Sequence, residues 1–235
     1  MIDCIVVGAG PGGIVTTKEL LEKGFENTIC LEQSDQLGGV FSRSYQNLVL
    51  TSSVTFSMFS DYWVGEGMNH HFWTKEEAVD YWTSYAQHFG VTDKIRFNSK
   101  VEKVSELDDG SWELRLSDGE KLQCKRLVMA IGNNNIPRYP EWSNQLTEIS
   151  YSHSKDYLNS DSFEGKNVLI VGGGESGVDH RPPREPLHGD GHQPEDRLRH
   201  RASPLLRHRG REGESGHGSF CVTRSLLAFR LCRDG

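Results

Sequence analysis

The sequence predicts an α/β protein with two Rossmann-like dinucleotide-binding domains, the second incomplete, followed by a C-terminal tail expected to be disordered. Two glycine fingerprints, each directly after an apolar, strand-like run, predict the two domains. An abrupt change of composition after residue 179 marks the tail. We therefore divide the chain into a first dinucleotide-binding domain (1–140), the start of a second (141–179) and the tail (180–235).

The first fingerprint is formed by Gly8, Gly10 and Gly13, in the spacing GxGxxG. The apolar run Cys4–Val7 precedes it, and a helix over Ile14–Lys23 is predicted to follow. Glycines at this spacing permit a tight turn and let backbone N–H groups at the helix N-terminus approach a pyrophosphate. The order strand, glycines, helix therefore predicts a dinucleotide site.

The second fingerprint is formed by Gly172, Gly174 and Gly177, and it follows the apolar run Val168–Val171. One fingerprint alone is a weak signal. Two in one chain, both after a strand, indicate two dinucleotides, most simply flavin adenine dinucleotide (FAD) and a nicotinamide dinucleotide.

An acid and a second pair of glycines follow the first fingerprint. Glu32 ends a second predicted strand, 24 residues after Gly8. An acid about 20 residues after the fingerprint hydrogen-bonds the adenosine ribose in this fold, although a surface glutamate is the alternative. Gly38 and Gly39 permit close backbone approach to a ligand, and a plain turn would also explain them.

The rest of the first domain is predicted to hold one long helix and a small antiparallel excursion of the sheet. Thr74 and Glu77 form a capping box that opens a helix to about Phe89, whose aromatic stripe we assign to the core. Three strand-like runs follow, over Ile95–Val104, Trp112–Leu116 and Leu122–Ile131.

Composition limits the class of protein. Of the 235 residues 35% are hydrophobic and 25% charged, as in ordinary globular proteins. No apolar run approaches the roughly 20 residues of a membrane span, and the first strand begins at Ile2, so a cytoplasmic location is expected. The five cysteines show neither a CxxC pair nor zinc spacing and are expected to be core thiols. His70 and His71 lack further ligands at metal spacing, so no metal site is predicted.

The tail differs from the rest of the chain. It has eleven Arg but no Lys, six of the ten His and five of the eight Pro, and its net charge is +4 against −11 before it. Basic tails often bind nucleic acid, but the joint loss of Lys, Ile, Asn, Tyr and Met is typical of GC-rich coding sequence in the wrong frame. We therefore expect a non-native tail and no nucleic-acid partner.

The motifs together resemble a family. The series GAGPGG, Glu32, LGGVF, LTSSVTFSMFSDY, AIG, HSKDY and VGGGESGVD over residues 2–179 is similar to the flavin-containing monooxygenases, a group of class B flavoprotein monooxygenases. The resemblance implies FAD and NADPH as cofactors. It implies that FAD is held by Gly8, Gly10, Gly13, Glu32, Gly38, Gly39, the backbone of Val101 and the loop at Gly132, and NADPH by Gly172, Gly174, Ser176 and Gly177.

Three local features relate the chain to the resembling group. His153 and Tyr157 match the second half of the family motif FxGxxxHxxxY, the linker between the dinucleotide domains, whereas Thr147 and Ile149 replace its Phe and Gly. Tyr157 is not followed by Pro, which favours this group over Baeyer–Villiger enzymes. Ser52 stands near the flavin where the animal enzymes have Asn, so it is the candidate catalytic residue, with one hydroxyl donor in place of an amide.

The resemblance also implies the reaction. NADPH would reduce FAD, and dioxygen would then supply one oxygen atom to a nucleophilic nitrogen or sulfur of a small-molecule substrate. A disulfide reductase shares the two-fingerprint layout but needs a redox-active cysteine pair. A non-enzymatic or remnant FAD-binding fragment is the other alternative, because the second domain has only its first strand and the start of its helix before the tail. We expect the chain as given to be inactive as a monooxygenase.

Overall fold

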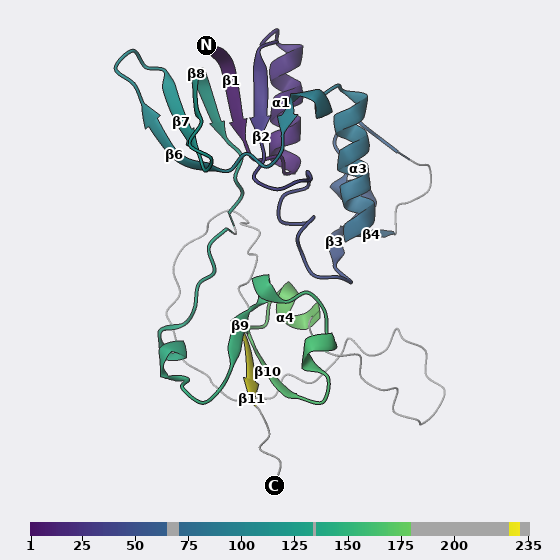
Figure 1. Cartoon of the computed structure of the whole chain (residues 1–235). Helices are drawn as coiled ribbons and strands as arrows, with labels where there is room; N and C mark the ends of the chain where they lie inside the picture. Colours follow the sequence, from purple (N-terminus) through teal and green to yellow (C-terminus); the bar gives the residue numbers. More distant parts are fainter. Residues whose placement is uncertain (65–70, 134, 180–225, 231–235) are drawn as a thin grey trace, which may run out of the picture.

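The computed structural model describes residues 1–64, 71–133, 135–179 and 226–230. Figure 1 shows two bodies, a larger α/β unit that begins at the N-terminus and a smaller unit that the chain enters after strand β8. The described residues contain no helix long and apolar enough to cross a bilayer.

A six-stranded sheet forms the larger unit, in the order β5-β2-β1-β8-β7-β6. Its strands are β1 (Ile2–Val7), β2 (Thr28–Leu31), β5 (Ile95–Arg96), β6 (Val101–Glu106), β7 (Trp112–Leu116) and β8 (Lys121–Met129). The first half, from β5 to β8, is parallel, and β7 and β6 continue it antiparallel. The predicted antiparallel excursion inside a parallel domain is confirmed.

The prediction of a single strand over Ile95–Val104 is wrong. The structure divides it into β5 and β6, which lie at opposite edges of the sheet. The chain turns at Asn98, whose φ of +53° is left-handed, and the polar sequence there offers no apolar alternation to continue a strand. The expected strand over Leu122–Ile131 ends at Met129, before the exposed Ile131.

Two helices cover the sheet and one another. Helix α1 (Pro11–Glu22) begins three residues before the expected start, because Pro11 fits the first helical turn. Helix α3 (Lys75–His88) begins at the predicted capping box, in which Glu77 N–H donates to Thr74 Oγ1 at 3.2 Å and Thr74 N–H to Glu77 Oε2 at 2.8 Å.

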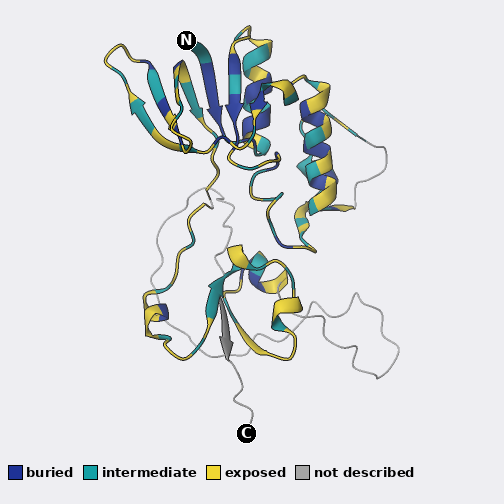
Figure 2. Ribbon diagram, viewed as in Figure 1, coloured by how far each residue is buried: buried dark blue, intermediate teal, exposed yellow. Residues whose placement is uncertain are grey.

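The core lies between these helices and the sheet, as the dark blue positions in Figure 2 show. Tyr81, Trp82 and Tyr85 of α3 are buried there, so the assignment of the aromatic stripe to the core is confirmed. Cys4, Cys30 and Cys124 are free and buried in three different strands, as expected of core thiols. Cys221 and Cys232 lie outside the described residues.

A short hairpin extends from the same unit. Strand β3 (Val49–Ser53) pairs antiparallel with β4 (Phe72–Thr74), and α2 (Val54–Ser57) follows β3. His71 is exposed as predicted for a loop, but it does have an acidic partner, since its Nε2 lies 3.1 Å from Glu77 Oε2. His70 lies outside the described residues.

The smaller unit contains a three-stranded sheet in the order β10-β11-β9. Its strands are β9 (Tyr151–His153), β10 (Asn167–Val171) and β11 (Leu226–Arg230), with helix α4 (Glu175–Asp179) after β10. Short 3-10 helices lie at Thr92–Lys94 in the larger unit and at Glu141–Gln145, Ser154–Asp156 and Asp161–Phe163 after β8. Strand β11, the described part of the tail, lies antiparallel between β9 and β10. Disorder is expected from the sequence over the whole tail, 180–235. Within it the structure describes residues 226–230 as strand β11, and the remaining tail lies outside the described residues.

Candidate dinucleotide site

Gly8 and Gly13 are required by the turn at the end of β1. Gly8 has φ +103°, and a Cβ atom on it would lie 2.6 Å from the carbonyl oxygen of Ala130. A Cβ on Gly13 would lie 1.8 Å from the carbonyl oxygen of Gly8. Both distances are too short for any side chain, so these two glycines serve the fold whether or not a ligand binds.

Gly10 is different, because the protein does not require a glycine there. Its φ is −74°, and a Cβ would meet only the Cα of Gly39, at an ordinary 3.7 Å. Gly10 is the N-cap of α1 and caps it without a side chain. The space beside it thus lies at the N-terminus of a 12-residue helix, where backbone N–H groups and the helix dipole favour a phosphate.

Gly38 and Gly39 lie against the first turn. Gly38 N–H donates to the carbonyl of Ala9 at 2.9 Å. Both glycines have positive φ, +106° and +63°, and a Cβ on Gly39 would lie 3.1 Å from the Cα of Gly10. The structure thus brings together the two glycine segments that the sequence assigns to the same ligand, and a plain turn stays the alternative explanation of Gly38 and Gly39.

Glu32 is not a surface residue, and that alternative is wrong. Its exposed fraction is 3%, and it directly follows β2. Glu32 Oε2 accepts from Ala9 N–H at 2.8 Å, while Oε1 accepts from the backbone and the hydroxyl of Ser34 at 2.9 and 2.6 Å. The carboxylate therefore braces the glycine turn. Oε2 accepts one bond among the described residues, and a carboxylate oxygen can accept two.

Val101 and Gly132 lie on segments that also lead to this edge of the sheet. The chain just before Val101 is tied to the acid, since Ser99 N–H donates to the carbonyl of Glu32 at 2.8 Å. Ala130 N–H donates to Val7 at 2.9 Å, which holds the loop of Gly132 beside the end of β1. Gly132 has φ +73° and open space around its Cα. Their contacts with a cofactor stay predictions.

Ser52 lies on β3. Among the described residues it has no recorded hydrogen bond to the glycine segments. Its side chain is exposed, and its Oγ lies 2.7 Å from the Oγ of Ser57, which follows on α2. A hydroxyl pair of this kind can donate outward, but its role in catalysis stays a prediction.

The second fingerprint forms the same kind of turn. Gly172 follows β10 with φ +120°, and Gly174 and Gly177 are buried around the start of α4, where Ser176 also lies. Val178 N–H donates to Gly174 at 3.0 Å. The strand, glycine and helix order predicted for residues 168–179 is therefore present.

The two linker residues flank a 3-10 turn before this fingerprint. His153 ends β9, and its Nδ1 accepts from Lys155 N–H at 3.1 Å. Tyr157 stacks on Phe163 with ring centroids 5.7 Å apart. Both residues have structural partners, and binding of a cofactor by them stays a prediction.

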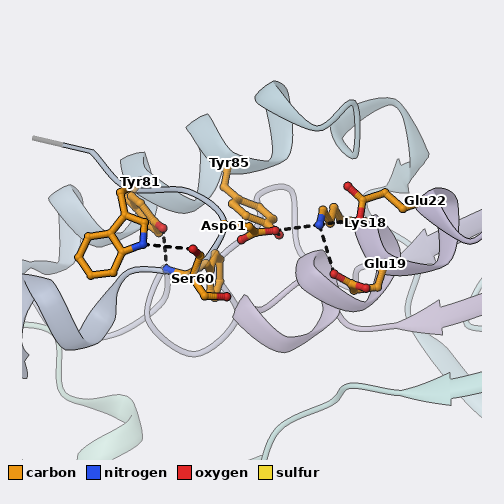
Figure 3. Close-up of polar contacts among 9 residues, drawn as sticks. Lys18, Glu19, Glu22, Ser60, Asp61, Tyr81 and Tyr85 are labelled. Carbon is orange, nitrogen blue, oxygen red and sulfur yellow. Dashed lines mark hydrogen bonds and ion pairs between the residues drawn. The ribbon is translucent and has the colours of Figure 1, made fainter.

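The sequence analysis missed a buried lysine on α1, the helix that follows the first fingerprint. Figure 3 shows Lys18 of α1 among three carboxylates, with Nζ 2.7 Å from Glu22, 2.8 Å from Asp61 and 3.2 Å from Glu19. Tyr85 of α3 donates to Asp61 at 3.2 Å. The hydrogen bond that the Lys18 ammonium donates to Asp61 contributes most to raising the pKa of Lys18, which stays charged. The cluster joins both helices to the loop after α2.

A parallel sheet, a glycine turn into a helix and a buried acid after the second strand define a dinucleotide-binding α/β protein. The family model of the pyridine nucleotide-disulphide oxidoreductases matches residues 5–181, and the chain belongs to this family. Burial raises the pKa of the Cys30 thiol to about 12, so it is protonated near neutral pH. The three described cysteines therefore offer no reactive pair for disulphide chemistry.

Curated relatives confirm the resemblance to flavin monooxygenases. A 4-hydroxybenzoate brominase (decarboxylating) of Marinomonas mediterranea is 32% identical over 74% of this chain and 34% of its own length. A probable indole-3-pyruvate monooxygenase of Arabidopsis thaliana is 33% identical over 74% of this chain and 42% of its own. Flavin-containing monooxygenase 5 of Oryctolagus cuniculus is 30% identical over 74% of this chain and 36% of its own length. The chain thus spans less than half the length of these relatives.

Solved structures share the fold. A cyclohexanone monooxygenase variant from Rhodococcus sp. Phi1, bound to NADP⁺, superposes with a TM-score of 0.54 at 23% identity, over 60% of this chain and 28% of its own. A steroid monooxygenase bound to NADP gives a TM-score of 0.52 at 23% identity, over 61% of this chain and 28% of its own.

We predict that the Lys18 cluster makes the fold sensitive to acid through Asp61. The Lys18 ammonium holds the pKa of Asp61 below its ordinary value. The stabilisation is therefore present above the unfolded aspartate pKa of about 3.9 and is lost as the pH falls through the lowered value. Asp61→Asn should reduce the free energy of unfolding at pH 7 by about 1.5 kcal/mol, as for a hydrogen bond between charged groups, and by less near pH 3.

Denaturant unfolding at both pH values measures this difference. Asp3→Asn is the matched control, because Asp3 pairs at 2.8 Å with Lys125, whose side chain is 56% exposed, and such surface pairs contribute little. Equal effects of the two substitutions at pH 7, or a loss at Asp61 that does not depend on pH, would contradict the prediction.

Proposed function

We propose that the chain carries the FAD site and the start of the NADPH site of a flavin-dependent monooxygenase. The observation that supports this most is the space at Gly10. The protein tolerates a Cβ there, yet the position is glycine, faces a second glycine segment and lies at a helix N-terminus. A ligand that must approach the backbone explains a glycine that the fold does not need.

In this proposal each described group has a defined task. The N–H groups at the start of α1 bind the FAD pyrophosphate, and Glu32 Oε2 accepts from the adenosine ribose. Gly38 and Gly39 admit the flavin side of the cofactor next to Gly10. The turn from Gly172 to Gly177 binds NADPH. When bound, FAD supplies the redox chemistry between NADPH and dioxygen.

The proposed substrate is a small molecule with a nucleophilic nitrogen or sulfur. The curated relatives support this, since they include flavin-containing monooxygenase 5 and a dimethylaniline monooxygenase [N-oxide-forming] of Macaca mulatta. A Baeyer–Villiger reaction is the second candidate, because the cyclohexanone monooxygenase has the same fold. Leu158, where those enzymes have Pro, favours the first. A non-catalytic FAD-binding fragment is the third.

The 235-residue chain by itself is proposed to be incompetent in oxygen transfer. It spans 34% of the length of the brominase and 36% of that of flavin-containing monooxygenase 5, so most of such an enzyme has no counterpart here. Met129, Ile131 and Ile136, at and after the end of β8, are exposed by 51%, 51% and 83%. A flavin at this edge would meet water, and exclusion of water is what preserves reactive intermediates.

Gly10→Val is predicted to abolish FAD binding without unfolding the protein. The valine side chain would fill the space beside the helix N-terminus, so we expect FAD affinity to fall about a hundredfold or more, equivalent to about 2.7 kcal/mol. The thermal midpoint of the flavin-free protein should change little, whereas Gly13→Val should unfold it, because its Cβ would overlap a carbonyl. Titration of the flavin-free proteins with FAD and thermal unfolding measure both effects. Undiminished FAD binding by Gly10→Val would refute the site.

NADPH is predicted to be the preferred reductant. Under anaerobic conditions the FAD-loaded protein should be reduced about tenfold faster by NADPH than by NADH at equal concentration, a difference of about 1.4 kcal/mol. Stopped-flow absorbance of the flavin measures both rates. Faster reduction by NADH would remove the NADPH assignment and leave the FAD site intact.

The chain is further predicted to oxidise NADPH without oxygenating a substrate. The expected balance is NADPH + H⁺ + O₂ → NADP⁺ + H₂O₂, because the residues described at this edge of the sheet leave it open to water. Hydrogen peroxide should therefore equal the NADPH consumed when a tertiary amine or thioether is present. Formation of N-oxide or sulfoxide in amounts comparable to NADPH consumption would show that this chain is a competent monooxygenase.

A further inference from the structure

A hydrogen bond formed by Tyr45 joins the two dinucleotide units. The Tyr45 hydroxyl donates to Asp179 Oδ2 at 2.6 Å, across 134 positions of sequence. Tyr45 lies between Gly39 and β3 in the larger unit, and Asp179 ends α4 in the smaller one. Tyr45 follows Gly39, of the second glycine pair, by six residues, and Asp179 follows Gly177, of the second fingerprint, by two.

The neighbouring residues tie the same two segments together. Gln46 N–H donates to the carbonyl of Leu158 at 2.8 Å, and Asn159 Nδ2 donates to Gln46 Oε1 at 3.3 Å. The Tyr45 ring packs on Tyr157 with centroids 6.0 Å apart and an interplanar angle of 59°. A backbone bond, a side-chain bond and a ring contact thus converge on the segment that leads to the second fingerprint.

The Tyr45 bond joins a buried hydroxyl to an exposed carboxylate. Tyr45 is 8% exposed, and a hydroxyl that donates to a carboxylate forms a charge-assisted bond. Burial, and then the hydrogen bond to Asp179, raise the pKa of Tyr45, so the hydroxyl keeps its proton across the physiological range. The bond depends on the Tyr45 hydroxyl. Tyr45→Phe would keep the ring contact with Tyr157 and leave the Asp179 carboxylate without this donor.

We propose that Tyr45 and Asp179 form a latch that sets the position of the second glycine fingerprint relative to the first. Its task is to hold the nicotinamide end of one cofactor at the distance and angle at which hydride can reach the flavin. Tyr45 and Asp179 are positioning residues, because they act through the turns beside them. The inference rests on the proposed function. Displacement of a reacting group by about 1 Å can cost about a hundredfold in rate.

The test compares Tyr45→Phe, Asp179→Asn and the double variant. In the flavin-free proteins, amide hydrogen exchange over residues 157–163 and 175–179 should accelerate in each single variant and no further in the double variant. In the FAD-loaded proteins, the anaerobic rate of flavin reduction at saturating NADPH should fall about tenfold or more, while the dissociation constant of FAD stays within about twofold.

Tyr151→Phe is the matched control, since it removes a tyrosine hydroxyl from β9 of the smaller unit and leaves Tyr45 and Asp179 intact. It should match the wild type in both measurements. Unchanged exchange in Tyr45→Phe, additive effects in the double variant, or loss of FAD affinity in step with the reduction rate would each overturn the latch. Failure of the proposed function is distinct, because it appears in the wild type as no FAD binding or no reduction by NADPH.

Discussion

The backbone contact at the end of β1 is the constraint on which the remaining structure depends. Gly8, Gly13 and the carbonyl of Ala130 approach one another so closely that no side chain fits at either glycine. This contact lets α1 start immediately after the strand, and it holds the end of β8 beside the turn. Because β1 is central and pairs with both β2 and β8, the position of the sheet edge, the helix and the loop at Gly132 all follow from it.

The glycines of the first fingerprint are needed for different reasons. Gly8 and Gly13 are fixed by overlap within the protein, whereas Gly10 has room for a methyl group against Gly39. In this turn, the glycines that the fold requires can therefore be told apart from the glycine that a ligand would require. Glu32 combines the two, because its carboxylate accepts the Ala9 and Ser34 donors and has capacity for one further bond at Oε2. Loss of this side chain would loosen the turn as well as remove a ligand contact.

Local signals predicted the fold well, and long-range polar contacts were not predictable. The strand before Gly8, the capping box of Thr74 and the buried stripe of α3 each follow from a pattern within a few residues. The break at Asn98 depends on one left-handed residue inside the stretch Ile95–Val104, which the sequence analysis took as a single strand. The bonds from Lys18 to Asp61 and from Tyr45 to Asp179 join residues that no periodicity relates, since only the folded chain brings them together.

The distribution of these contacts separates support of the site from communication between sites. The Lys18 cluster lies within the larger unit, where it joins α1, α3 and the loop at Asp61, so its loss would act on folding and on both cofactors together. The Tyr45 bond crosses between the units. If Tyr45 and Asp179 form the proposed latch, a change there would leave the contacts of the first glycine turn intact and shift the second turn. Of the two polar features that the sequence did not reveal, the bond between the units is therefore the one through which the larger unit can govern the use of the second dinucleotide.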